Sequence, residues 1–155
     1  MPGKDKFTAV ERSAIMARVR SWDTTPERLV RSTLHKLGYR YRLHDARLPG
    51  KPDLSFPSRR VALFVHGCFW HRHPSCKRAS TPVARQEYWL KKFERTTARD
   101  LRNRVELEQN GWTVLIIWEC QLRGARWVPE VQRALKAASR LTWTRKFGVQ
   151  VNRSP

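Results

Sequence analysis

Hydrophobic residues recur at three- and four-residue spacing in two segments, which is the pattern of an amphipathic helix. The first predicted helix has its N-cap at Thr25, Pro26 in the first helical position, and a stop at Gly38. We expect its buried stripe to be Leu29, Val30, Leu34 and Leu37. The second helix covers residues 86–110, ends before Gly111, and would bury Leu90, Phe93, Thr97, Leu101 and Val105. Shorter helices are predicted over residues 13–19 and 129–141.

Strand patterns lie between these helices. Residues 39–44 alternate apolar and polar, which indicates a half-buried strand, and residues 53–56 form a short extended segment after a turn at 48–52. The continuous apolar runs at 61–65 and 112–118 are typical of strands buried on both faces. Residues 67–82 show neither pattern. The order of helix, three strands, helix, strand and helix predicts an α/β domain with a mixed sheet flanked by helices.

The length of 155 residues suits one domain, and we expect residues 1–12 to form a flexible arm and 13–155 a single domain. Lys and Arg number 32 against 13 Asp and Glu, a net charge of +19 spread along the chain. Such a charge predicts a polyanionic partner, most simply a nucleic acid. A membrane is the rival partner, but the apolar runs are too short to span a bilayer and the N-terminus lacks a signal core. We therefore expect an intracellular protein.

The segment HGCFWHRHPSC at residues 66–76 concentrates metal-binding side chains. Cys68, His73 and Cys76 lie within it, and Cys120 follows the strand predicted at 112–118. Four sulfur and imidazole ligands suit a structural, tetrahedral Zn²⁺. Both Cys68 and Cys120 follow apolar strands, whose ends would meet if the strands were parallel neighbours. The alternative is that the cysteines are ordinary small buried residues.

Asp53 and His66 suggest catalysis. Asp53 begins one predicted strand and His66 ends the next, an arrangement found in nucleases that hold Mg²⁺ against a phosphate. A neutral imidazole could take a proton from water. Each residue has a plainer explanation, because Asp53 could cap a turn and His66 could be a satisfied core histidine. His71 also competes with His73 as a zinc ligand.

Aromatic residues accompany these groups. Phe69 and Trp70 lie on the irregular segment and Trp89 opens the helix that follows. In a basic protein such rings can stack on bases or enter between base pairs, and the alternative is that they fill the core. We favour the first role for Phe69 and Trp70, and a core position for Trp112 and Trp118.

PGKPDL, FVHGCFWHRHPSC, EYWLKK and GWTVLIIWEC, in this order, closely resemble the very-short-patch-repair (Vsr) DNA mismatch endonucleases. The resemblance covers roughly residues 6–123. It implies a restriction-endonuclease-like fold with a bound structural Zn²⁺. It also implies a Mg²⁺-dependent enzyme that nicks one strand of duplex DNA 5′ to the T of a T:G mismatch, such as arises when 5-methylcytosine deaminates.

The resemblance also assigns roles to residues. It implies that Asp53 and the backbone carbonyl of Val65, where many relatives have Thr, hold Mg²⁺. It makes His71 the water-activating histidine, His66 the second catalytic histidine and Asp100 the acid that supports His66. Glu27 would lie near the water shell of the metal.

The remaining assignments concern zinc and DNA. Cys68, His73, Cys76 and Cys120 match the zinc ligands, although some relatives have one residue fewer between His73 and Cys76. Phe69, Trp70 and Trp89 resemble aromatics that enter the duplex beside the mismatch, and Met16 a residue that reaches the other groove. The implied setting is a monomer in the bacterial cytoplasm, associated with the nucleoid and with mismatch-repair proteins. The competing hypotheses are a zinc-stabilised DNA-binding module without catalysis and an RNA-binding protein.

Overall fold

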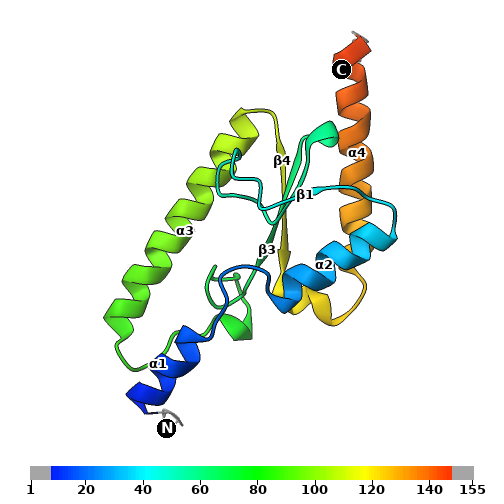
Figure 1. Cartoon of the computed structure of the whole chain (residues 1–155). Coiled ribbons are helices and arrows are strands. Elements are labelled where there is room, and N and C mark those ends of the chain that lie inside the picture. The colour runs from blue at the N-terminus through cyan, green and yellow to red at the C-terminus, as the bar shows by residue number, and fades with distance from the viewer. Residues whose placement is uncertain (1–7, 148–155) are drawn as a thin grey trace.

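The computed structural model describes residues 8–147 (Figure 1). Its helices are α1 (Ala9–Ala17), α2 (Thr25–Lys36), α3 (Gln86–Gln109) and α4 (Trp127–Phe147). Its strands are β1 (Arg42–Leu43), β2 (Leu54–Phe56), β3 (Val61–His66) and β4 (Thr113–Trp118). Short 3-10 turns cover Pro57–Arg59, Lys77–Ala79 and Glu119–Arg123. The predicted mixed α/β architecture is therefore confirmed.

The four strands form one sheet in the order β1-β2-β3-β4. The pairs β1–β2 and β2–β3 are antiparallel, whereas β3 and β4 are parallel, with His66 opposite Trp118. A parallel pair needs a long crossover connection, which here consists of the irregular segment after β3 and helix α3. The crossover thus starts from the same end of the sheet at which β4 finishes.

Helices cover both faces of the sheet, with α3 on one side and α2 and α4 on the other (Figure 1). The main hydrophobic core lies on the α2–α4 side and includes Leu34 of α2, Leu63 of β3, Ile117 of β4 and Leu135 of α4. Because side chains alternate along a strand, His66 projects toward the α3 side. The polar chemistry is therefore placed between the sheet and α3.

Helix α2 begins one residue earlier than predicted. Thr24 is the N-cap, and its hydroxyl accepts a hydrogen bond from the backbone N–H of Glu27 at 3.4 Å. The predicted stripe is half right: Val30 and Leu34 are buried, but Leu29 and Leu37 are 44% and 45% exposed. Only one narrow side of this short helix contacts the sheet, so the flanking leucines stay at the surface.

Helix α3 has nearly the predicted bounds but a different buried face. Trp89, Phe93 and Leu107 are buried, whereas Leu90, Leu101 and Val105 are 52%, 62% and 42% exposed. The predicted stripe is therefore wrong except for Phe93. Two neighbouring faces of this helix both carry hydrophobic residues at three- and four-residue intervals, so the spacing alone does not identify the buried face. The face that packs on the sheet also carries Asp100. A charged residue on this face makes it look like the solvent-exposed side of the helix when the sequence is read for hydrophobic spacing.

Other elements differ in length from the prediction. Helix α1 starts at Ala9, within the predicted arm, where Thr8 and Glu11 form a reciprocal capping box, and residues 1–7 of that arm lie outside the described residues. Helix α4 begins two residues earlier than predicted and extends to Phe147. Strand β1 keeps only two residues, although Tyr41 still packs edge-on against Phe56 at 5.9 Å between ring centroids. Within residues 8–147, no helix is long and apolar enough to cross a membrane.

Candidate active site and metal centre

A cleft of about 1380 Å³ opens between the α3 side of the sheet and the segment joining α1 to α2. The predicted site residues that line it are Met16, Glu27, Asp53, Val65, His66, Trp70, His71, Trp89 and Asp100. These residues come from helices α1, α2 and α3, from β3, and from the loops before β2 and after β3. The fold therefore gathers into one concave surface side chains that are up to 84 positions apart (from 16 to 100).

Asp53 lies immediately before β2 at the floor of this cleft. Its Oδ2 atom accepts a hydrogen bond of 2.7 Å from the backbone N–H of Val65, which brings the backbone of Val65 beside the carboxylate. Burial raises the pKa of Asp53 to about 6; the Val65 hydrogen bond opposes the rise and the charge of Glu27 adds to it. A bound cation would offset this burial and repulsion, so the carboxylate suits a divalent metal.

Glu27 is buried at the start of α2, where two hydrogen bonds fix its carboxylate. Oε2 accepts from the backbone N–H of Asp23 at 2.8 Å, and Oε1 accepts from the Thr24 hydroxyl at 3.0 Å. The side chain of His44 lies between this carboxylate and that of Asp53. Each of Glu27, His44 and Asp53 has a possible ligand atom within 4.8 Å of the others.

His71 and Asp100 form a close pair across the cleft. Nδ1 of His71 lies 2.5 Å from Oδ2 of Asp100, which is held on α3. Burial opposes ionisation of this carboxyl, but the hydrogen bond from His71 and the electrostatic effects of His71, His66 and Arg99 together outweigh it, and the pKa of Asp100 is lowered. Nδ1 therefore carries the proton toward Asp100 and Nε2 is left as an acceptor. Asp100 is thus hydrogen bonded to His71, whereas the support of His66 by Asp100 stays a prediction; the three side chains have possible ligand atoms within 4.8 Å of one another.

His66 lies directly behind His71. The two imidazole rings are stacked at 3.8 Å between centroids with an interplanar angle of 10°. Burial lowers the pKa of His66 to about 4, and the neighbouring His71 contributes in the same direction. His66 is thus a neutral imidazole at neutral pH. It supports the ring of His71 and offers an uncharged polar group to the cleft.

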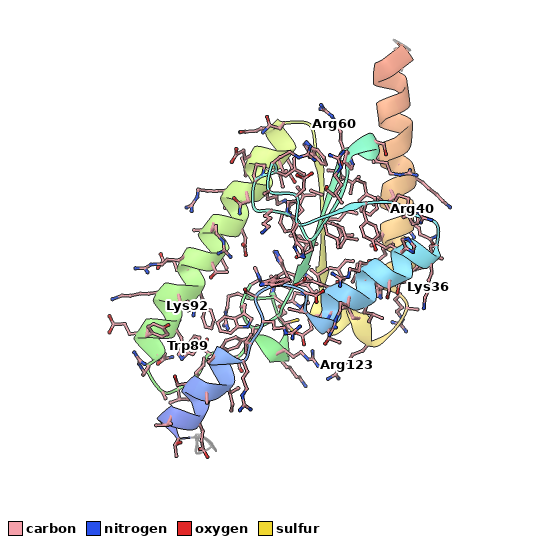
Figure 2. All side chains as sticks on the ribbon, in the orientation of Figure 1. Lys36, Arg40, Arg60, Trp89, Lys92 and Arg123 are labelled. Atoms are coloured by element: carbon pink, nitrogen blue, oxygen red, sulfur yellow. The ribbon has the colours of Figure 1, made fainter. Side chains whose placement is uncertain are left out.

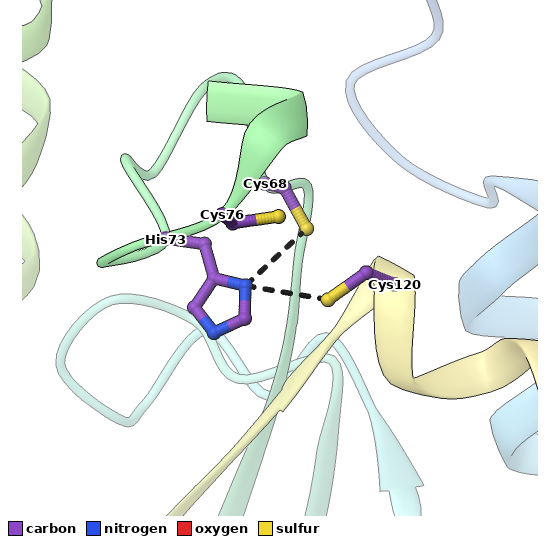
Figure 3. A group of neighbouring side chains, drawn as sticks. All are labelled: Cys68, His73, Cys76 and Cys120. Carbon is purple, nitrogen blue, oxygen red and sulfur yellow. Dashed lines mark hydrogen bonds between the residues drawn. The ribbon is translucent and has the colours of Figure 1, made fainter. Parts of the chain in front are cut away.

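The zinc ligands predicted from the sequence converge just beyond the carboxyl ends of β3 and β4 (Figure 3). Nδ1 of His73 lies 3.7 Å from Sγ of Cys68 and 3.3 Å from Sγ of Cys120, and Cys76 completes the group. A sulfur and a nitrogen bound to one tetrahedral Zn²⁺ should be roughly 3.5 Å apart. The four residues therefore fit the ion. His71, the competing candidate, is instead paired with Asp100.

The parallel register explains this convergence. His66 pairs with Trp118, and Cys68 and Cys120 each follow two residues later. The ring of His73 is stacked on Trp118 at 4.3 Å. Trp118, predicted to be a core residue, thus serves the metal centre and contacts His66 edge-on at 5.3 Å.

Phe69, Trp70 and Trp89 form an aromatic cluster, of which Trp70 and Trp89 line the cleft. Phe69 contacts Trp70, Trp89 and Phe93 with ring centroids 5.0, 5.4 and 5.2 Å apart. Phe69 and Trp70 are half-buried, whereas Trp89 is only 7% exposed. The Lys92 ammonium lies 5.0 Å from the Trp70 ring centroid, so positive charge borders these rings. The fold thus brings together the three aromatic residues singled out from the sequence, with Trp89 beneath the other two.

Positive charge is distributed over the outside of the molecule. Lys36, Arg40, Arg60, Lys92 and Arg123 extend from different elements (Figure 2). A shallow groove along α3 adds Lys91, Arg95, Arg99 and Arg102. Such a surface suits the phosphate backbone of a nucleic acid.

Three residues of the cleft escaped sequence reasoning. The alternating pattern of residues 39–44 puts His44 on the polar side of a strand, and the hairpin register that pairs Leu43 with Leu54 places it opposite Asp53. Lys92 borders Trp70 and was not separated from the general charge. Trp22 is 67% exposed at the rim of the cleft, and its polar neighbours Ser21 and Asp23 were the available signal for an exposed loop.

Comparisons with known proteins find DNA endonucleases. A family model described as DNA mismatch endonuclease Vsr matches residues 4–78. The type II nicking enzyme V.XorIIP of Xanthomonas oryzae pv. oryzae is 49% identical over 118 residues, which are 76% of this chain and 86% of that protein. DNA mismatch endonuclease Vsr of Escherichia coli is 42% identical over 120 residues, 77% of this chain and 74% of that protein. V.NmeAIP of Neisseria meningitidis, also a type II nicking enzyme, is 41% identical over 119 residues, 77% of this chain and 84% of that protein.

A basic mixed α/β protein with this cleft and these relatives is a DNA endonuclease. The chain belongs to the family of DNA mismatch endonuclease Vsr.

Proposed function

We propose that this protein is a Mg²⁺-dependent mismatch endonuclease that nicks one strand of duplex DNA 5′ to the T of a T:G mismatch. The observation that carries the proposal is the meeting, in one cleft, of the Asp53–Val65 backbone pair with the His71–Asp100 pair. The first pair suits a hard cation and the second suits proton transfer. Together they supply what hydrolysis of a phosphodiester requires.

Asp53 and the backbone carbonyl of Val65 would hold Mg²⁺, with Glu27 near its water shell. What Mg²⁺ supplies when bound is stabilisation of the negative charge that develops on the scissile phosphate. His71 accepts a proton from the attacking water at Nε2, because Nδ1 is bonded to Asp100. Asp100 stabilises the imidazolium that results, and neutral His66 keeps the ring of His71 in place by stacking.

Zn²⁺ held by Cys68, His73, Cys76 and Cys120 would have a structural role, since four protein ligands leave no open position. The loop that it anchors carries His71, Phe69 and Trp70. This loop contributes few residues to the hydrophobic core, apart from buried Cys68. Bound zinc would therefore fix His71 and the aromatic cluster relative to β3.

Mismatch selection is assigned to Phe69 and Trp70, with Trp89 below them and Met16 approaching from α1. A mismatched pair stacks poorly, so separating it from its neighbour costs less than separating paired bases. Rings that enter the stack therefore favour a T:G site. The Lys and Arg side chains contribute affinity without this choice.

We further propose a restriction-endonuclease-like fold with residues 13–155 acting as one endonuclease domain. The protein would work as a monomer in the bacterial cytoplasm, associated with the nucleoid, and mismatch-repair proteins are its expected partners. The relatives named above come from bacteria and support this setting.

The proposal is tested with Asp53→Ala and His71→Ala in parallel nicking and DNA-binding assays. Both variants should bind a T:G duplex as the wild type does and fail to nick it in saturating Mg²⁺. Asp53→Ala lacks the carboxylate that would hold the ion, and His71→Ala lacks the base. Near-normal nicking by either variant would remove the proposed mechanism. Tight binding by a wild-type protein that does not nick would favour the zinc-stabilised DNA-binding module. Preference for RNA over mismatched duplex in a competition assay would favour the RNA-binding hypothesis.

A further inference from the structure

The imidazole of His44 faces two carboxylates at once, that of buried Glu27 and that of half-buried Asp53. Its Nε2 atom lies 3.9 Å from Oε2 of Glu27, and its Nδ1 atom lies 4.0 Å from Oδ1 of Asp53. Both distances exceed that of a hydrogen bond. Atoms that bind a common ion at about 2.1 Å are roughly 3 to 4.2 Å apart. The 4.0 Å between Nδ1 of His44 and Oδ1 of Asp53 therefore matches two ligands of one cation better than a direct hydrogen bond.

The backbone holds His44 in this position. Its N–H donates to the carbonyl of Asp53 at 3.3 Å, which sets the two residues opposite each other across the β1–β2 hairpin. Its φ of 46° is in the left-handed region, which turns the side chain toward the cleft floor. The side chain is 23% exposed, so the ring is mostly enclosed yet reachable from the cleft.

Three of the four carboxylate oxygens accept hydrogen bonds from the protein. Those of Glu27 accept from the backbone N–H of Asp23 and the Thr24 hydroxyl, and Oδ2 of Asp53 accepts from the backbone N–H of Val65. Oδ1 of Asp53 points toward the imidazole. If one ring nitrogen binds an ion, the other ring N–H is left beside a carboxylate, which is the usual outer partner of a ligating histidine.

We propose that His44 is a protein ligand to the divalent cation held at Asp53, near Glu27, and that its nitrogen shifts the site from Mg²⁺ toward Mn²⁺. Imidazole nitrogen suits transition ions, whereas Mg²⁺ strongly prefers oxygen. A site with a nitrogen donor therefore gains more affinity for Mn²⁺ than for Mg²⁺. This inference rests on the proposed function, because it names the ion selectivity of the same metal position.

The test uses the zinc-loaded, DNA-free full chain and Mn²⁺ as the probe. Electron spin-echo modulation detects a ¹⁴N nucleus bound to Mn²⁺, and titration by electron paramagnetic resonance gives its dissociation constant, with Mg²⁺ measured by competition. The variant is His44→Asn, because Asn tolerates the left-handed backbone but its side chain is too short to replace the imidazole. His35→Asn is the matched control, since His35 is exposed on α2.

We expect ¹⁴N modulation in the wild type and in His35→Asn, and its loss in His44→Asn. The ratio of Mn²⁺ to Mg²⁺ affinity should fall about tenfold in His44→Asn and stay unchanged in the control. His71→Asn should retain the modulation. An unchanged ratio and modulation in His44→Asn would overturn the inference, and so would loss of the modulation in His71→Asn alone.

Nicking by the wild type in Mg²⁺ separates this inference from the proposed function. If the wild type nicks T:G duplex and His44→Asn keeps the wild-type ion preference, the inference fails and the function stands. If Mn²⁺ binding depends on His44 but the wild type cuts no duplex, the ion site stands and the function fails.

Discussion

Asp100 of α3 and His71 of the loop after β3 are joined by a contact of 2.5 Å between Oδ2 and Nδ1. The contact crosses the cleft and fixes which imidazole nitrogen is free to take a proton. His66, stacked behind at 3.8 Å, has no such carboxylate contact and a pKa of about 4, lowered chiefly by burial. Of the two histidines, His71 is therefore the one equipped to act as a base.

Asp100→Asn should slow nicking by ~10²-fold or more while leaving DNA binding unchanged, since general-base catalysis contributes about that much. An amide in this place can donate to Nδ1, which would put the ring proton on Nε2 and remove the acceptor. Single-turnover nicking at saturating enzyme gives the rate. Glu94→Gln, an exposed carboxylate on the same helix, is the control and should nick normally. A normal rate for Asp100→Asn would remove Asp100 from the mechanism.

Cys120→Ala should lower both zinc content and the free energy of unfolding, because structural zinc contributes directly to folding. The wild type should contain one zinc per chain. Elemental analysis and thermal unfolding of the same preparations check the two effects together. Cys120 is the ligand farthest in sequence from the rest, so its loss also frees the loop from β4. A well-folded wild type without zinc would contradict the assignment.

Asp45→Asn should destabilise the protein near neutral pH but not in strong acid. Side-chain hydrogen bonds from Arg47 lower the pKa of Asp45 from 3.8 to about 2. A folded-state pKa below the unfolded value gives stability that is present above about pH 4 and is lost as the pH falls through about 2. Urea unfolding of wild type and variant should therefore differ at pH 7 and converge as the pH falls toward 2. Glu106→Gln changes an exposed residue and should show no such convergence with the wild type. If the free energies of unfolding of wild type and Asp45→Asn differed by the same amount at every pH, titration of Asp45 would be ruled out as the cause.

Much of the zinc centre was predictable because it follows from one local rule. Cys68 and Cys120 each come just after an apolar run, and parallel pairing brings such ends together. The partner of His71 was not predictable, because Asp100 is 29 positions away and the contact depends on which face of α3 turns inward. That face could not be chosen from spacing alone, since Leu101 and Val105 offered a competing hydrophobic stripe. His44 was missed because its placement depends on a left-handed backbone angle that its neighbours do not signal.

Phe69→Ala/Trp70→Ala should weaken binding to T:G duplex more than binding to C:G duplex. Stacking of a ring on a base is worth ~1–3 kcal/mol, and the mismatch is where a ring can enter most easily. Equilibrium binding to both duplexes at two salt concentrations measures the difference. Arg95→Ala on the α3 groove should weaken both complexes alike and reduce their salt dependence. Parallel losses in the double aromatic variant would show that the rings do not distinguish the mismatch.

The most direct measurement is the nicking of two end-labelled duplexes that differ only in T:G versus C:G at one position, each with and without Mg²⁺. We predict a single nick 5′ to the T in the T:G duplex when Mg²⁺ is present. The C:G duplex should remain intact over the same period, and neither duplex should be cut without the divalent ion. Equal cutting of both duplexes, or nicking that persists without a divalent ion, would contradict the account.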